Sequence, residues 1–199
     1  MNPLKSVSGS IITGLVLMIV LSLLLPASAD VALSLGSLDR WLHIVSGVIW
    51  IGILYYFNVI QIPALAVGLA DKGGPGNAGI IKYIAPPALL WFRWGAVATV
   101  VSGVLLMEFS YGGGGMMKAL MLREGFVTIG VGGWLGIIMA LNVWVIIWPN
   151  QKKVIGVVPA TDEQKAKSRV MASMASRVNF VLSIPMLMAM GGQSHGLPF

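Results

Sequence analysis

The chain has 199 residues, of which 57% are hydrophobic and only 10% are charged. Soluble domains usually carry about 25% charged residues, so this composition excludes a water-soluble globule. The net charge of +6 does not indicate nucleic-acid binding, because an excess of Lys and Arg in a membrane protein reports orientation and lipid contact. The absence of cysteine excludes a disulfide, a thiolate metal site and the CxxCH attachment of a c-type haem.

Apolar runs of roughly 20 residues, long enough to cross a hydrocarbon core of about 30 Å, recur along the chain. They predict an all-α integral membrane protein with one domain, a bundle of five transmembrane helices. The predicted spans are 11–29, 39–62, 87–110, 126–148 and 172–192, and the loops expected in the cytoplasm are 63–86 and 149–171.

The first span ends in Pro-Ala-Ser-Ala before Asp30, a pattern that is also typical of a signal-peptide cleavage site. A removed signal peptide and a retained helix, acting as a signal anchor, are therefore competing interpretations. We count the run as the first helix.

Prolines and caps predict where the other helices begin and end. Ser37 is a candidate N-cap of the second helix and Pro63 marks its end. The third helix is expected to follow Pro86-Pro87, and Pro149 is expected to stop the fourth.

The fifth helix opens with Thr161-Asp-Glu-Gln164, which fits a capping box. We expect it to run along the membrane surface or through the cytoplasm to about Ala172. It then crosses the membrane to about Gly192, with a kink at Pro185.

The distribution of Lys and Arg over the loops predicts the orientation. With the N-terminus in the cytoplasm, eight basic residues lie inside and three outside, the direction of the positive-inside rule. The C-terminus then lies outside, on the periplasmic side of a bacterial inner membrane. The inside set is Lys5, Lys72, Lys82, Lys152, Lys153, Lys165, Lys167 and Arg169, and the outside set is Arg40, Lys118 and Arg123.

Small residues recur at four-residue spacing on the third and fourth helices, which permits close approach of backbones. We expect these stripes to face each other or a neighbouring chain, in ordinary bundle packing or against the edge of a cofactor. The stripes are Gly95, Thr99 and Gly103, and Gly132, Gly136 and Ala140.

The two histidines are the candidate metal ligands. His43 shares one helical face with Gly47 and Trp50, about one turn inside the outer end of the second helix. His195 follows the outer end of the fifth helix, so both imidazoles are predicted on the same side. Neutral imidazole is a common axial ligand of haem iron, and a glycine one turn away leaves room for the macrocycle. Haem b bound by His43, with His195 as second ligand, competes with a plain packing role.

A polar cluster is predicted in the inner half of the helices. It contains Arg93, Asn142, Arg177 and Asn179, and Asn58 and Gln61 of the second helix can join it. A charge at such a depth is costly and needs a partner. The cluster can bind an anionic substrate, a quinone head group or a haem propionate, or it can hold helices together by hydrogen bonds. For Glu108 an interfacial ion pair with Arg40, His43 or Arg123 is expected.

Four stretches carry a family resemblance that covers most of Asp39 to His195. They are RWLHIVSGVIWIGILYYFNVIQ, RWGAVATVVSG, GGWLGIIMALNVWVIIWPNQKKVIG and ASRVNFVLSIPMLMAMGGQSH. Together they resemble the membrane domain of the cytochrome c-fused bacterial urate hydroxylases, the urate oxidase N-terminal family. A shorter similarity, through Arg40-Trp-Leu-His43, links the chain to the copper-resistance D and haem-dependent protoporphyrinogen oxidase families, and it also points to His43.

The resemblance implies a membrane-bound oxidoreductase that acts on urate and passes electrons to its own c-type haem domain. Because the sequence lacks that domain, we expect a stand-alone short form whose electrons leave through a separate cytochrome c or oxidase. The first hypothesis is thus a redox-associated membrane protein with haem b at His43. The second is an accessory subunit of a larger respiratory or oxygenase complex, and the third is direct oxidation of urate or another purine at the polar cluster.

Overall fold

The computed structural model describes residues 2–25 and 34–198. The chain divides into two compact units, Met1–Ser34 and Leu35–Phe199. All regular elements in the described ranges are helical, which confirms the predicted all-α class. Five of these helices are long and apolar enough to cross a membrane. The predicted signal-peptide cleavage site, at 26–30, lies outside the described residues.

The first unit contains a short 3-10 turn, η1 (Pro3–Lys5), and one apolar helix, α1 (Val7–Leu24). The hydroxyl of Ser6 caps α1 by accepting a hydrogen bond from the Gly9 amide at 3.0 Å. Leu25 has an extended backbone, with φ −76° and ψ 132°, as expected for a residue that precedes a proline. The predicted span of 11–29 is therefore wrong at both ends.

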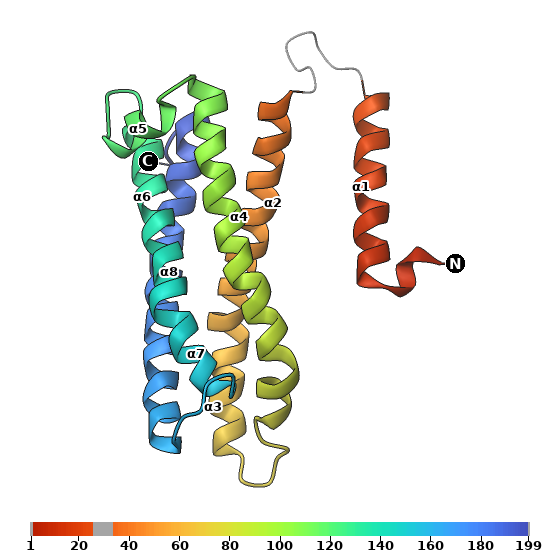
Figure 1. Ribbon diagram of the computed structural model, residues 1–199, viewed down its shortest axis with the longest axis vertical. Helices are drawn as coiled ribbons and strands as arrows, with labels where there is room; N and C mark the ends of the chain where they lie inside the picture. The colour runs from red at the N-terminus through yellow and green to blue at the C-terminus, as the bar shows by residue number, and fades with distance from the viewer. Residues whose placement is uncertain (1, 26–33, 199) are drawn as a thin grey trace. The chain divides into compact units, whose positions relative to one another are not determined.

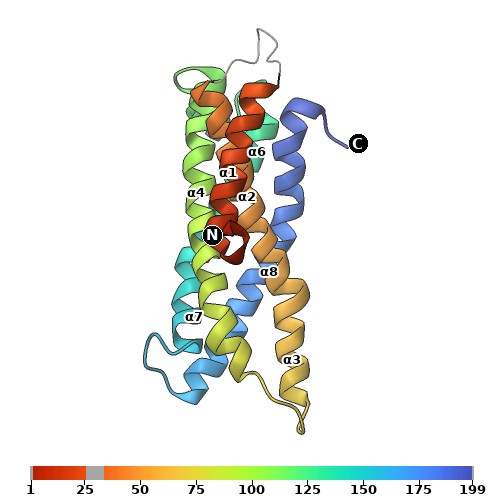
Figure 2. The same cartoon turned by 90° about the vertical axis from the view of Figure 1, so that its right-hand side faces the viewer.

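The second unit holds four long helical rods that lie side by side (Figure 1). The short helix α5 lies at one end of the rods, together with the C-terminus. Helices α3 and α7 lie at the opposite end, as both Figure 1 and Figure 2 show. These ends are called the α5 end and the α7 end below. The elements are α2 (Leu35–Tyr55), η2 (Tyr56–Gln61), α3 (Ile62–Ala70), η3 (Ile80–Ile84), α4 (Ala85–Tyr111), α5 (Gly115–Leu120), α6 (Val127–Asn142), η4 (Val143–Ile147), α7 (Trp148–Val154) and α8 (Asp162–His195).

The helix ends predicted at prolines are wrong, because the rods continue through Pro63, Pro86-Pro87 and Pro149. Each proline site follows a wide π-helical turn, η2, η3 or η4. The residue that closes each turn donates to the carbonyl five residues back. Proline clashes with the carbonyl four residues before it, and a π turn shifts that carbonyl out of the way. Two predicted stops and one predicted start are thus accommodated within continuous helices.

The corrected rods are longer than the predicted spans. They run over Leu35–Ala70, Ile80–Tyr111, Val127–Val154 and Asp162–His195, so the predicted cytoplasmic loops shrink to 71–79 and 155–161. At 1.5 Å per residue the rods measure roughly 42–54 Å, more than a hydrocarbon core requires. Ser37, the predicted cap, lies inside α2, which begins at Leu35.

The capping box predicted for the last helix is confirmed. The Thr161 hydroxyl accepts from the Gln164 amide at 3.2 Å, and the Gln164 side chain accepts from the Thr161 amide at 2.9 Å. The helix then runs without interruption to His195 and passes through Pro185. A surface segment followed by a separate crossing segment is therefore not observed.

The small-residue stripes do not face each other, which corrects that prediction. A Cβ added at Gly95 would lie 3.4 Å from Cα of Trp50 on α2, and one at Gly132 would lie 3.2 Å from Cβ of Ala189 on α8. The α4 stripe thus packs on α2, and of the α6 stripe Gly132 packs on α8, in ordinary helix packing.

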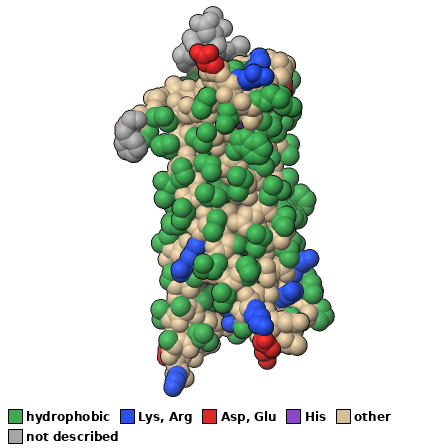
Figure 3. Space-filling view, turned by 90° about the vertical axis from the view of Figure 1, so that its left-hand side faces the viewer, with side chains coloured by type: hydrophobic (Ala, Val, Ile, Leu, Met, Phe, Trp, Pro, Cys, Tyr) green, Lys and Arg blue, Asp and Glu red, His purple; other side chains and the backbone are tan. Residues whose placement is uncertain are grey.

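Large apolar side chains fill the space between the rods. The buried core includes Trp50, Leu54, Phe57, Leu89, Phe92, Met139, Val143, Ile147 and Met186. On the face in Figure 3, hydrophobic side chains cover the middle of the molecule, and most of the visible Lys and Arg side chains lie in its lower part. The middle of this face therefore offers water few hydrogen-bonding side chains.

Candidate functional site

His43 lies in the interface between α2 and α4, and its side chain is half-buried. Its Nδ1 lies 2.9 Å from the carbonyl oxygen of Thr99 and 3.2 Å from the hydroxyl of Ser102. A Cβ added at Gly103 would come within 3.0 Å of the imidazole Cε1. Only glycine at that position therefore lets the ring lie flat against α4 without displacement.

The bond to Thr99 determines which imidazole nitrogen carries the proton. A carbonyl oxygen only accepts, so Nδ1–H of His43 must be the donor. Nε2 of the neutral ring is then unprotonated and has a free lone pair. Within residues 2–25 and 34–198, no hydrogen bond of Nε2 is observed. Donation from the distal ring nitrogen to a carbonyl is the arrangement that orients histidines which ligate metals.

Gly47 and Trp50 share the face of His43, as predicted, but that face is filled by α4. A Cβ at Gly47 would lie 3.9 Å from the methyl group of Thr99. Trp50 is only 1% exposed and belongs to the core. Neither residue therefore opens onto a space for a flat macrocycle.

Asp39, one turn before His43 on α2, escaped the sequence analysis. It is buried, and its Oδ2 has no hydrogen-bond partner in the described part of the chain. Its spacing of four residues from His43 indicates that the two side chains are neighbours on one helix face. The sequence did not indicate that a carboxylate there would be buried.

His195 is the last residue of α8 and is exposed. Among the described residues, no hydrogen bond joins it to His43. Glu108 also differs from its expected role, because its carboxylate accepts from the amides of Gly114 and Met116 at 2.7 and 2.9 Å. It thereby caps α5 instead of forming the predicted ion pair.

Asn142 and Asn179 do meet, as the predicted polar cluster requires. The Asn142 amide donates to Oδ1 of Asn179 at 2.7 Å and to the carbonyl of Ala175 at 2.9 Å. Asn179 is fully buried and donates to the carbonyl of Met139 at 3.0 Å. These bonds tie α6 to α8. Oδ1 of Asn142 is buried and has no partner among the described residues.

Asn58 and Tyr55 add hydrogen bonds between α8 and the rod Leu35–Ala70. The Asn58 amide donates to the Ser176 hydroxyl at 2.9 Å. The hydroxyls of Ser183 and Tyr55 lie 3.2 Å apart. Sequence reasoning missed both serines, since a serine in an apolar helix gives no signal of its partner.

Arg93 is only 8% exposed and takes part in none of the ion pairs formed by the described residues. Its guanidinium carbon lies 3.3 Å from the ring centre of Trp148 and 6.0 Å from that of Trp144. Such stacking contributes about 0.5–2 kcal/mol, less than the several kcal/mol lost when a charge leaves water. The tryptophans therefore offset only part of the cost of burying Arg93.

The four residues predicted to cluster thus separate into three places. Arg93 lies against the tryptophans, Asn142 and Asn179 form their own pair, and Arg177 is exposed on α8. Arg177 and Asn179 are two residues apart, which on a helix puts them on different faces. The missed partner is Trp148, whose role depends on how α4 packs against α7.

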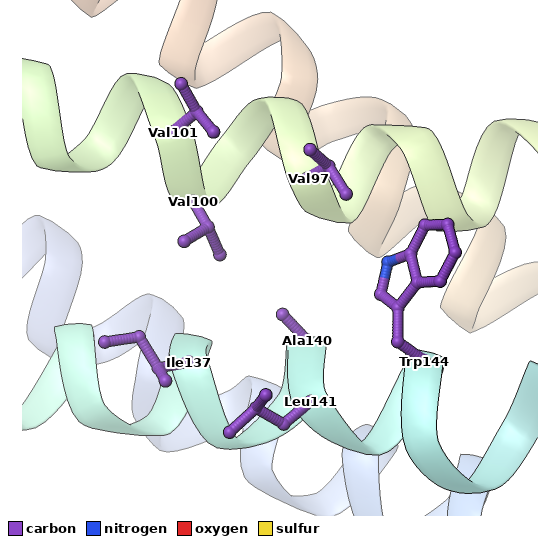
Figure 4. A pocket seen from close by; sticks show the side chains of 7 residues that line it. All are labelled: Val97, Val100, Val101, Ile137, Ala140, Leu141 and Trp144. Carbon is purple, nitrogen blue, oxygen red and sulfur yellow. The ribbon is translucent and has the colours of Figure 1, made fainter.

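An apolar hollow lies between α4 and α6. Its volume is about 240 Å³, and its lining includes Val97 and Val100 on one side and Ile137, Leu141 and Trp144 on the other (Figure 4). A second hollow of about 290 Å³, between α7 and α8, is polar and includes Lys153 and Lys167.

These helices can be compared with known proteins. Residues 114–199 match the urate oxidase N-terminal family. The matched segment holds α5, α6, η4, α7 and α8, and with them Asn142, Asn179 and Trp148. The predicted resemblance is thereby confirmed for this part of the chain. His43 and Arg93 lie in the part that precedes it. No curated protein and no solved structure matches the chain.

Within the urate oxidase N-terminal segment, the Asn142–Asn179 pair is a polar contact between buried or half-buried side chains. It joins the two longest helices of that segment, so it holds the segment together whatever else it does. The segment meets the preceding part of the chain at Arg93 on Trp148 and at Asn58 on Ser176.

Proposed function

We propose that this protein is a redox-associated integral membrane protein of the bacterial inner membrane, with its N-terminus in the cytoplasm. The membrane placement is supported by five helices that are long and apolar enough to span a membrane. The eight basic residues on the side predicted to be cytoplasmic, against three on the other side, support the orientation. The urate oxidase N-terminal match supports the redox assignment.

His43 is the proposed axial ligand of a haem b. The observation that carries the proposal is the bond from Nδ1 to Thr99 at 2.9 Å, since it leaves Nε2 unprotonated and available. The ligand atom fits the group, whereas Gly47 and Trp50 do not form the predicted cradle because α4 covers them. A haem held by Nε2 of His43 would supply one-electron transfer when bound.

Electrons need an exit from such a site, and this proposal assigns it to a separate cytochrome c. The chain itself can hold no c-type haem through a CxxCH motif, since it has no cysteine.

The pyridine haemochrome spectrum of the purified protein tests the haem proposal. We expect about one haem b per chain in the wild type and its loss in His43→Ala. His195→Ala, the other histidine variant, is the matched control and should keep its haem because that side chain is exposed and remote in sequence. A monodisperse wild-type protein without haem, or full haem retention in His43→Ala, contradicts the proposal.

Oxidation of urate is a second candidate function, favoured by one observation. The family match contains the Asn142–Asn179 pair, and the buried Oδ1 of Asn142 has no partner in the described chain, so it can accept from an N–H of a purine. Urate loss from membranes with an added electron acceptor tests it. The rate should fall at least tenfold in Asn142→Leu, and a wild-type rate equal to that of vector membranes refutes it.

A further inference from the structure

Among the described residues, Arg93 is a buried cation that has no counter-ion, and it lies next to an apolar hollow. Its Nε is inaccessible and has no hydrogen-bond partner in the described ranges. The only acidic side chains in ion pairs there, Asp162 and Glu163, are bound to Lys165 and Lys167. A buried guanidinium in this state has unused donors for an anion.

A second cation lies on the same indole. Lys152 Nζ is 5.8 Å from the ring centre of Trp148, and the Arg93 guanidinium is 3.3 Å from it. A buried and a half-buried cation thus both lie near the Trp148 ring. Trp144 Nε1, also buried, has no hydrogen-bond partner among the described residues.

The apolar hollow continues from this place along the same helix faces. Arg93 and Val97 are four residues apart and Val101 is four further on, so they share one face of α4. Trp148, Trp144 and Leu141 follow one another in the same way on the facing rod. From Arg93 to Val101 the seam is about 12 Å long. In Figure 4, the Trp144 indole stands at one end of the hollow with its nitrogen turned inward.

We propose that this seam binds one phospholipid with an anionic head group. Arg93 and Lys152 hold the phosphate, and one acyl chain lies between α4 and α6 against Val97, Val100 and Leu141. The occupant follows from charge and polarity, because two cations at one end match a phosphate and the apolar remainder matches a hydrocarbon chain. The proposal rests on membrane insertion of the rods but is independent of haem and of urate.

Native mass spectrometry of the full chain released from nanodiscs tests this. Phosphatidylglycerol and phosphatidylcholine with the same acyl chains are the two probes, and incorporation into the nanodiscs tests insertion by itself. We expect one retained phosphatidylglycerol, bound at least tenfold more tightly than phosphatidylcholine. Arg93→Gln should lose roughly tenfold in affinity, since it removes a charged donor. Arg123→Gln, an exposed arginine at the α5 end, is the matched control and should change affinity less than twofold.

Two further variants keep the test decisive. Lys152→Gln alters a half-buried surface position that tolerates substitution, and it should lower phosphatidylglycerol affinity about threefold even if Arg93→Gln does not fold. Val100→Trp should fill the seam and weaken the lipid without changing the head-group charge. Equal retention of both lipids, or wild-type affinity in Lys152→Gln and Val100→Trp, overturns the proposal. Displacement of the lipid by millimolar inorganic phosphate also overturns it, because the site would then take a free anion.

Discussion

The contact between Asn142 and Asn179 gives the sharpest energetic prediction, because its geometry is simple and both side chains can be truncated. Asn179→Ala removes two side-chain hydrogen bonds, at 2.7 Å to Asn142 and at 3.0 Å to the Met139 carbonyl. Hydrogen bonds between membrane helices contribute about 0.6 kcal/mol on average and at most about 1.7 kcal/mol. Asn179→Ala should therefore lower the free energy of unfolding by about 1–3 kcal/mol.

The double-mutant cycle with Asn142→Ala isolates the pair. Asn142 keeps one bond of its own, to the Ala175 carbonyl at 2.9 Å, so the two single substitutions do not remove the same contacts. We expect a coupling free energy of about 0.6–1.7 kcal/mol between the two sites.

Reversible unfolding in mixed detergent and SDS micelles, followed by circular dichroism, measures each variant. Asn150→Ala is the matched control, because in the described part of the chain the Asn150 amide bonds only to the Ile146 carbonyl of its own rod, at 2.8 Å. It should cost less than about 0.5 kcal/mol. A coupling energy below about 0.3 kcal/mol would refute the assignment of this pair as the bond between α6 and α8.

Three other substitutions test separate features. Gly103→Val should displace the His43 ring, since an added Cβ lies 3.0 Å from Cε1. The nitrogen chemical shift of Nδ1 should then lose its hydrogen-bonded value. Gly133→Ala, whose added Cβ meets no atom within 4 Å, should leave that shift unchanged. Pro149→Ala should keep the wild-type helical circular dichroism, because η4 already accommodates the proline, and a gain in helix content would contradict a continuous rod. Thr161→Ala should lower the free energy of unfolding by about 1 kcal/mol through loss of the cap, and an unchanged unfolding midpoint would argue against the capping box.

The sequence alone determined the class of this protein. Long apolar runs and few charges leave no alternative to helices that satisfy their own backbone groups. The box at Thr161 and Gln164 was also readable, since its partners are three residues apart. Such features are set by neighbours in the chain, and the structure retains them.

The helix ends predicted from prolines were wrong where a neighbouring π turn relieves the steric clash of the proline. Pro63 and Pro149 are helix stops by propensity, yet each follows a π turn that relieves its clash. A proline pattern shows the clash but does not show the wider turn, so the lengths of the rods came only from the structure.

The candidate site depended still more on tertiary structure. The sequence identified the charges and amides within the apolar helices but did not say which rods are neighbours. Arg93 and Arg177 have identical side chains in apolar helices, and only packing buries the first against Trp148 and leaves the second exposed. Periodicity reports which residues share a face of one helix. The partner of that face is decided by the shapes of all the rods together, as with His43 on Thr99.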